Sequence, residues 1–204
     1  MNENTNNKLM YVSFLGAGKY EEAAYQWNDT LSKKTKYIQI AALQILQQSP
    51  ESFPDFIRIF GTETSKKKHW NPEEGNGLLY ELTELGLKEG EDFAFSLIHE
   101  ELSTSNQWKD FQNVLSLIPS YSELIFDMTH GFRSVPIVFS TAIQFLKLTK
   151  NVNIKHVLYG VYLTEEPSSK IVDYVDFYEI NDWTDAVSRL VDQADARKLS
   201  EVAQ

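Results

Sequence analysis

The sequence predicts an α/β fold: a doubly wound, Rossmann-like, mainly parallel sheet with helices on both faces. Short apolar runs, typical of buried strands, alternate along the chain with segments whose apolar residues have helical spacing. Three of these runs are followed at once by small or polar residues, at 16–20, 61–65 and 127–134. Because the carboxyl ends of parallel strands meet at one edge of a sheet, these three loops can converge on a single pocket.

The first half of the chain contains three predicted strands and two predicted helices. The strands are the apolar runs 9–15, 56–60 and 93–98. Apolar residues at helical spacing predict one helix over 38–48, and four leucines predict a second that stops at Gly86. Residues 21–34, with aromatic and turn residues, are expected to be irregular or to form a hairpin.

The second half continues the alternation. A helix over 108–118 leads to the strand 124–126, and a further helix is expected to run to about Lys150. Two strands, 154–163 and 171–180, are predicted to form a C-terminal β-hairpin, followed by a short helix that begins at Asn181 and Asp182. We assign residues 1–190 to one domain and 191–204 to a tail or the start of a linker.

The loop after the strand 124–126 carries the densest set of functional groups. Asp127, Thr129, His130, Arg133 and Ser134 fall within eight residues. A glycine in their midst, Gly131, lets the backbone turn sharply, and a helix is predicted to follow. Free amides at a helix start together with an arginine favour an anion, phosphate above all. The alternative is an ordinary strand–loop–helix connection without a ligand, in which Asp127 caps backbone amides and His130 is a loop residue.

The other two loops are less specific. Gly16, Ala17, Gly18, Lys19 and Tyr20 form neither a Walker loop nor a complete dinucleotide fingerprint, so a plain turn is the alternative. The loop 61–65 contributes Thr62 and Thr64. The lysine run 66–68 is interpreted as a solvated face, with a phosphate contact as the alternative. Residues 99–101, His-Glu-Glu, lack a second ligand pair, so no metal site and no cofactor are predicted.

Composition narrows the classes of function. The 204 residues are 42% hydrophobic and 24% charged and include no cysteine, which excludes disulfides and thiolate zinc sites. A net charge of −10 argues against binding long nucleic acid, although a local basic pocket for a small phosphorylated ligand stays open. No apolar run reaches the roughly 18 residues of a membrane span, and residues 1–8 lack a signal-peptide core, so we expect a cytoplasmic protein.

Three segments carry a resemblance to a known family. The residues Asp-Met-Thr-His-Gly-Phe-Arg-Ser at 127–134 resemble the signature of the DxTHG group of CRISPR-associated proteins, which carry a CRISPR-associated Rossmann-fold (CARF) sensor domain. The segment 13–20 is similar to the first-strand motif of that group, and 181–187 is similar to the segment that ends its sensor domain. The resemblance covers the chain from residue 9 to about residue 200.

The resemblance implies a homodimer that binds a cyclic oligoadenylate, above all cyclic tetra-adenylate, in type III CRISPR antiviral defence. It also implies a fused or separate effector domain, often a HEPN-type ribonuclease. Nothing HEPN-like is found in these 204 residues, so we expect either a sensor domain cut from a longer protein or a standalone one. In this family the ligand is held by the loop after the first strand and by the Asp-Thr-His-Gly loop, here residues 16–20 and 129–134. We add the loop 61–65 and Tyr162 to the expected ligand site, and Tyr20 and Tyr162 are the candidates for stacking on adenine. The residues of the expected site are Gly16, Ala17, Gly18, Lys19, Tyr20, Thr62, Thr64, Asp127, Thr129, His130, Gly131, Phe132, Arg133, Ser134 and Tyr162.

Two further hypotheses stay open. In the first, the protein is a metal-independent ring nuclease that cleaves the ring it binds, with Lys19, Thr129 and Arg133 stabilising the phosphate and His130 as an acid–base group. His130 is equally interpreted as a hydrogen-bonding loop residue. In the second, the chain is an ordinary nucleotide-binding α/β protein unrelated to CRISPR.

Overall fold

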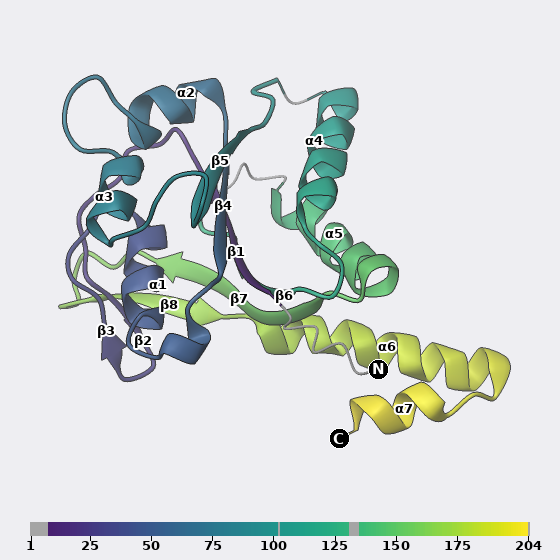
Figure 1. The fold of residues 1–204 in the computed structure, drawn as a ribbon. Coiled ribbons are helices and arrows are strands. Elements are labelled where there is room, and N and C mark those ends of the chain that lie inside the picture. The colour runs from purple at the N-terminus through teal and green to yellow at the C-terminus, as the bar shows by residue number, and fades with distance from the viewer. Residues whose placement is uncertain (1–7, 102, 131–134, 204) are drawn as a thin grey trace.

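The computed structural model describes residues 8–101, 103–130 and 135–203. It confirms the α/β class: a mixed, mostly parallel sheet of eight strands lies between two layers of helices (Figure 1). The strands are β1 (Leu9–Leu15), β2 (Tyr25–Trp27), β3 (Thr30–Leu31), β4 (Phe56–Gly61), β5 (Phe93–Leu97), β6 (Glu123–Asp127), β7 (Asn153–Val161) and β8 (Ser169–Asp173).

Helices and helical turns connect most of these strands. They are α1 (Ile38–Leu46), the 3₁₀ turn η1 (Pro50–Ser52), α2 (Glu63–Ser65), the π-helical turn η2 (Lys66–Trp70), α3 (Leu78–Glu84), α4 (Thr104–Leu117), α5 (Val135–Lys150), α6 (Val175–Gln193) and α7 (Arg197–Val202). Among the described residues, no helix is long and apolar enough to cross a membrane.

The sheet is doubly wound about its first strand. Its order is β3-β2-β8-β7-β6-β1-β4-β5, and β1 pairs in parallel with both β4 and β6. The chain therefore builds outward from β1 in one direction through β4 and β5, and in the other through β6 and β7. Strand order reverses between β1 and β6, which is the point where open α/β sheets bind ligands.

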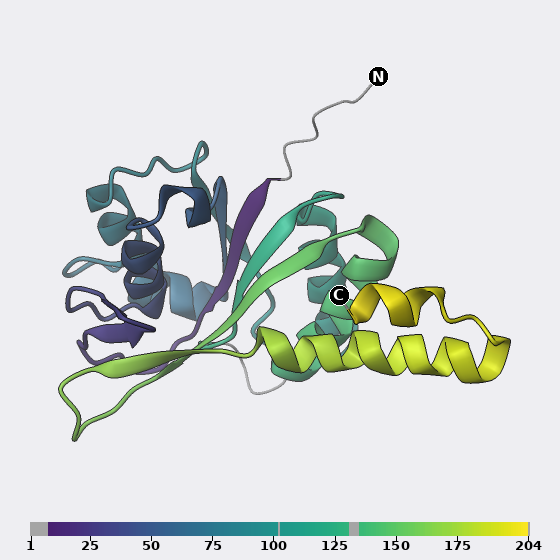
Figure 2. The same cartoon turned by 90° about the horizontal axis from the view of Figure 1, so that it is seen from below.

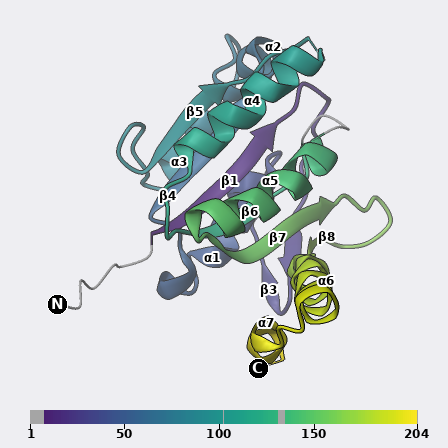
Figure 3. The same ribbon diagram turned by 90° about the vertical axis from the view of Figure 1, so that its right-hand side faces the viewer.

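Each face of the sheet is covered by its own apolar core. Helices α1 and α3 pack on one face, with Ile40, Leu43 and Leu78 among the buried side chains. Helices α4 and α5 pack on the other, where Val114 and Ile143 are buried (Figure 3). Strand β1 contributes to both cores and is buried along its whole length, because parallel strands at the centre of such a sheet have no solvent face.

Two predictions about loops have different outcomes. Residues 21–34 do contain a hairpin, formed by β2 and β3. The predicted loop 61–65 is wrong beyond Thr62, because α2 begins at Glu63. Thr62 caps this turn: its Oγ1 accepts a hydrogen bond from the Ser65 amide at 3.2 Å, a preference of threonine at helix starts.

The C-terminal hairpin is confirmed, since β7 and β8 are antiparallel, but the predicted strand 171–180 ends early. At Asp173 the chain enters the 19-residue helix α6, so Asn181 and Asp182 lie inside this helix and do not start it. The carboxylate of Asp173 accepts the Val175 amide at 3.0 Å, which favours a helix start there. Tyr178 and Ala186 then pack inward at helical spacing, and this period prevails over the partial alternation of the sequence.

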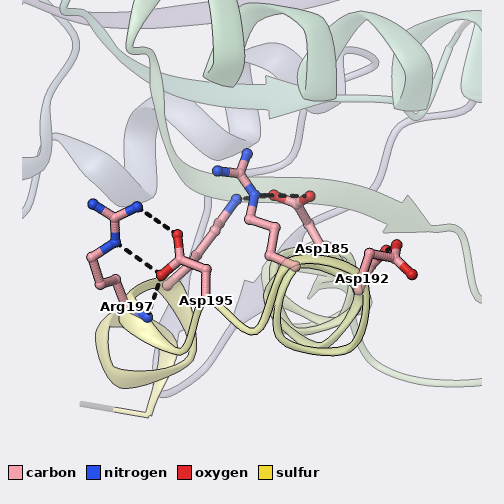
Figure 4. A network of polar contacts seen from close by, with 7 residues as sticks. Asp185, Asp192, Asp195 and Arg197 are labelled. Atoms are coloured by element: carbon pink, nitrogen blue, oxygen red, sulfur yellow. Dashed lines mark hydrogen bonds and ion pairs between the residues drawn. The ribbon is translucent and has the colours of Figure 1, made fainter.

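Helix α6 projects away from the sheet, and α7 folds back along it (Figure 2). The predicted domain boundary at residue 190 thus falls within α6. One ion pair joins the two helices, that of Asp185 in α6 with Lys198 in α7 (Figure 4). Asp185 also pairs with Arg189 within α6, and Arg197 pairs with Asp195 of the connection at 2.6 Å. All these side chains are at least partly exposed, so solvent weakens each pair.

Gly160 lies inside β7, where a glycine indicates a close approach to the backbone, and the structure shows what approaches. A Cβ atom on Gly160 would lie 2.7 Å from Ile38 Cδ1 and 3.3 Å from Thr129 Cγ2. Ile38 is buried, so it has little room to move. Gly160 therefore lets α1 and the residues after β6 pack against β7.

Gly160→Ala is expected to lower the free energy of unfolding by about 1–3 kcal/mol, because the added methyl group overpacks a filled space. Urea denaturation followed by circular dichroism measures this. The matched control is Gly18→Ala, whose Cβ would meet nothing within 4 Å and whose stability should equal that of the unchanged protein. Equal urea midpoints for Gly160→Ala and the unchanged protein would contradict the packing argument.

Candidate functional site

A cavity lies at the carboxyl end of β1, where the strand order reverses. Its volume is about 330 Å³. Its lining comes from the ends of β1, β4, β5 and β6, which is the convergence that the sequence predicted. The lining residues are Phe14, Leu15, Gly16, Ala17, Gly18, Lys19, Tyr20, Thr62, Ile98, Thr129 and His130.

The loops after β1 and β6 touch one another. A Cβ atom on Gly16 would lie 3.2 Å from the His130 carbonyl oxygen, so a glycine permits this approach. The Tyr20 hydroxyl donates to the Gly16 carbonyl at 3.0 Å and closes the loop upon itself. The loop after β1 is thus packed against the start of the Asp-Thr-His-Gly segment.

A buried carboxylate organises the floor below this contact. Asp127 is fully buried, and its Oδ2 accepts hydrogen bonds from the Tyr11 hydroxyl at 3.0 Å and the Ser13 hydroxyl at 2.7 Å. Its Oδ1 accepts from the Thr129 amide at 2.9 Å and the Thr129 hydroxyl at 2.5 Å. Burial, and then the charge of Asp127, raise the pKa of Tyr11, so this phenol keeps its proton.

This network reaches neighbouring elements. Thr129 Oγ1 accepts the Gly160 amide of β7 at 2.8 Å. From α1, the Gln39 side-chain amide donates to Ser13 Oγ and to the Phe14 carbonyl, both at 3.0 Å. The hydroxyl hydrogen of Thr129 is already donated to Asp127, so Thr129 positions the loop and has no hydrogen left for a ligand.

Tyr20 is held between two imidazoles. Its ring stacks on His130 at a centroid distance of 4.2 Å and on His69 at 4.3 Å, each at an interplanar angle of 25°. His69 belongs to η2, so three separate segments of the chain meet in this stack. Burial raises the pKa of Tyr20 and lowers the pKa values of His69 and His130, so all three rings are uncharged at neutral pH.

A second cavity of about 130 Å³ lies on the other side of this stack. Lys19, Tyr20 and His130 line both cavities. Tyr162, predicted as a stacking residue, lines only the second, together with Glu21, Tyr25 and Lys36. The Tyr20–His130 pair is therefore a wall between two spaces, each large enough to admit part of a ligand.

Lysines surround the loop after β1, although the chain as a whole is acidic. The Lys19 ammonium is exposed and pairs with Glu21 at 2.5 Å. Lys68 reaches the Ala17 carbonyl at 3.4 Å, so the lysine run is not only a solvated face. A phosphate entering here would compete with Glu21 for Lys19 and would meet a locally positive surface.

The structure places the predicted site residues in three groups. Those of the loop after β1 line the main cavity with Thr62, Thr129 and His130, and Tyr162 lines the adjoining one. Asp127 lies beneath the site, and Thr64 lies in α2, where its amide donates to Glu100, so neither is among the described residues that line these two cavities. Gly131, Phe132, Arg133 and Ser134 lie outside the described residues.

Sequence reasoning missed His69, which follows the lysine run interpreted as a solvated face, and Lys36, which lies between the segment 21–34 and the helix predicted over 38–48. It also missed the apolar lining, Phe14, Leu15 and Ile98, which was assigned to strands alone. The one available signal was the position of His69 next to Trp70, since a tryptophan after a charged run marks a return to the core.

The sequence suggested no metal at residues 99–101. His99 pairs with Asp110 of α4 at 2.7 Å, and Glu100 accepts the amide of Thr64. Within the ranges that the structure describes, no three acidic or histidine side chains gather as metal ligands would.

Comparison with known proteins gives one relative. No family model matches the chain. The chain is 32% identical over 81 residues to the CRISPR-associated protein MJ1674 of Methanocaldococcus jannaschii, an alignment that covers 37% of this chain and 13% of that protein. That similarity supports an association with CRISPR. The aligned part is a small fraction of the relative, so its activity as a whole is not transferred.

Asp127→Asn is expected to destabilise the fold by about 2–4 kcal/mol, because four donors converge on a buried carboxylate and an amide cannot accept from all of them. Chemical denaturation measures the change. The control is Glu91→Gln, which removes an exposed pair with Lys88 and should cost less than about 1 kcal/mol. An Asp127→Asn protein as stable as the control would show that the network is not required.

Proposed function

We propose that this protein binds a cyclic oligoadenylate, above all cyclic tetra-adenylate, at a homodimer interface as a CARF-type sensor in type III CRISPR antiviral defence. The supports are the resemblance to the DxTHG group, the partial similarity to a CRISPR-associated protein and the geometry of the cavity. One observation carries the proposal: the loops after β1 and β6 meet around one cavity at the strand-order reversal.

The cavity suits a phosphodiester. The backbone of residues 16–18 faces it, and Gly18 has open space around it, so a phosphate can approach the main chain there. Lys19 supplies a mobile cation at the entrance. Both faces of the Tyr20 ring, predicted as a stacking residue, are already covered by His69 and His130. Tyr162, which lines the adjoining cavity, is therefore the candidate for stacking on adenine, a contact worth roughly 1–3 kcal/mol per base.

Symmetry supports a dimer. Cyclic tetra-adenylate has a two-fold axis and four negative charges, so two identical loop sets related by a two-fold axis match it. Each protomer would supply one copy of Lys19 and of Arg133. Their doubled positive charge would offset the charge of the ring phosphates in a chain whose net charge is −10.

One observation favours ring cleavage as a second candidate function. His130 lines both cavities and is neutral near pH 7, the protonation state that a general base needs. A ribose 2′-hydroxyl would give its proton to this base and attack the adjacent phosphorus. The bond from phosphorus to O5′ would break, O5′ would receive a proton, and a 2′,3′-cyclic phosphate and a 5′-hydroxyl would remain.

Gly18→Ala is expected to weaken binding of cyclic tetra-adenylate at least tenfold, because its methyl group occupies the space through which a phosphate reaches the backbone. Isothermal titration calorimetry measures the affinity and should give one ring per two chains for the unchanged protein. Since the same substitution fits the free protein without a clash, a loss of affinity reports on the ligand alone.

The charge control for this measurement is Lys109→Ala, an exposed lysine of α4 away from the cavity, which should bind like the unchanged protein. Near-native affinity in Gly18→Ala would contradict backbone recognition. If no cyclic oligoadenylate of any ring size binds, the chain is better described as an ordinary nucleotide-binding α/β protein.

Incubation with labelled cyclic tetra-adenylate in a chelator separates the two candidate functions. For a sensor, we expect the ring to be recovered intact after hours at a protein concentration that binds it fully. Linear products with 2′,3′-cyclic phosphate ends would establish the ring nuclease instead. In that case His130→Gln should slow cleavage by about 10²–10⁴-fold, the usual contribution of a general acid or base.

A further inference from the structure

The stack of His69, Tyr20 and His130 has a role that the proposed function does not explain. Two titratable rings flank one aromatic ring at centroid distances of 4.3 and 4.2 Å, although a single neighbour would suffice to hold Tyr20 in place. One of the two, His69, does not line either cavity. It acts on the site through Tyr20 and through the loop after β1.

His69 is held firmly in this position. The next residue, Trp70, is buried, and its ring lies 4.8 Å from the ring of Phe95, measured between centroids. This contact anchors the end of η2 in the core. The Asn71 amide donates to the Lys66 carbonyl at 3.1 Å, a hydrogen bond of the π-helical kind that local functional distortions often show. The turn therefore presents the imidazole of His69 to Tyr20 as a built feature of the fold.

The tautomer of His69 follows from its hydrogen bond. Nε2 lies 2.7 Å from the Gly18 carbonyl oxygen, which can only accept, so Nε2 carries a hydrogen. Nδ1 is then the position that gains a proton when the ring becomes charged. A proton on His69 would leave its bond to the loop intact and would add a positive charge next to Tyr20.

The charged and titratable groups around the two imidazoles set the direction of the effect. Burial is the main cause that lowers the pKa values of His69 and His130. The positive charges of Lys68 and Lys36 also oppose a charge on His69. A charge on His130 is opposed by His69 and favoured by Asp127, which lies below it. Three of the remaining neighbours line the adjoining cavity: Lys19, Glu21 and Tyr162. The fourth, Tyr37, contacts the rings of Tyr20 and His69 edge-on. Without a ligand, positive neighbours and burial keep the pair uncharged.

We propose that His69 is a positioning residue of this site, and that the His69–Tyr20–His130 stack takes up one proton when a phosphate-bearing ligand enters the cavity. This inference deepens the proposed function, since it concerns the same site. A phosphate beside His130 supplies the negative charge that burial and the lysines otherwise oppose. Only one proton is expected, because two charged imidazoles on opposite faces of one ring would repel each other.

The sign of the pH dependence follows. In the free protein the two histidines titrate below their usual value of about 6.5, and a bound phosphate raises the pKa of the one that is charged. At a pH between the pKa of the free protein and that of the complex, the protein takes up a proton when the ligand binds, so affinity rises as the pH falls. Below the pKa of the free protein the ring is charged with or without ligand, and the dependence disappears.

The test is calorimetric titration of the full chain with cyclic tetra-adenylate and, separately, with inorganic tripolyphosphate, from pH 8 to pH 5.5. We expect the dissociation constant to fall by about three- to tenfold for each pH unit, tenfold being the limit for one proton. Repeating the titration in two buffers of different ionisation enthalpy counts the protons taken up directly, and we expect about one per site.

His69→Gln tests the positioning role. A glutamine amide can still donate to the Gly18 carbonyl but cannot be protonated, so the pH slope and the proton count should fall by the share of the proton that His69 carries, and the double variant His69→Gln/His130→Gln should show neither. A merely structural role would weaken binding equally at all pH values and leave the proton count unchanged, which would overturn the inference. The matched control is His99→Gln, an exposed histidine paired with Asp110, which should keep the full pH slope.

The outcomes separate this inference from the proposed function. If tripolyphosphate, which itself titrates in this range, binds with a proton uptake that falls in His69→Gln, but cyclic tetra-adenylate does not bind, the proposed ligand is wrong and the inference stands. If the ring binds with no proton uptake in the pH range, the proposed function stands and the inference falls. If neither anion binds, both are rejected.

Discussion

The structure depends on one buried carboxylate. Asp127 ends the central strand β6 and accepts four hydrogen bonds, two from side chains of β1 and two from Thr129 in the loop after β6. A charge without solvent is tolerated only when its acceptor sites are filled, so β1, β6 and Thr129 are held in one arrangement. The same residue that could be interpreted as a binding group in the sequence is thus the support on which the binding loops rest.

The site follows from this arrangement and from sheet topology. Because β1 is the first strand and the sheet grows from it in both directions, the loops after β1 and β6 have no helix between them and can touch. The cavity is built mostly from main chain and rings, with cations at its margin, which gives a local attraction for anions in an acidic protein. The wall formed by Tyr20 and His130 divides the space, so recognition of a base and of a phosphate can be handled by separate cavities.

Much of the fold was predictable because buried parallel strands are read directly as apolar runs. All the strands of the parallel core lie where apolar runs place them, and of the two alternatives left open for residues 21–34 the structure shows the hairpin, at 25–31. The failures have physical causes. Residues 171–180 have apolar residues compatible with two periods, and packing of Tyr178 against the core selected the helix. The segment 63–70 looked like a solvated loop because its charges hide the anchoring effect of Trp70.

The sequence alone determined the fold class, the order of the strands along the chain and the loops that meet at the sheet edge, because these depend on local periodicity and on where polar residues interrupt it. Only the tertiary structure decided that Asp127 and Thr129 are committed to each other, that Thr64 turns away into α2, and that His69 stacks on Tyr20. Thr64 meets Glu100 across 36 residues and His69 meets the loop after β1 across 51, while the Asp127–Thr129 pair, local in sequence, is fixed by Tyr11, 116 residues from Asp127. Close packing selects such contacts, and no local pattern encodes them.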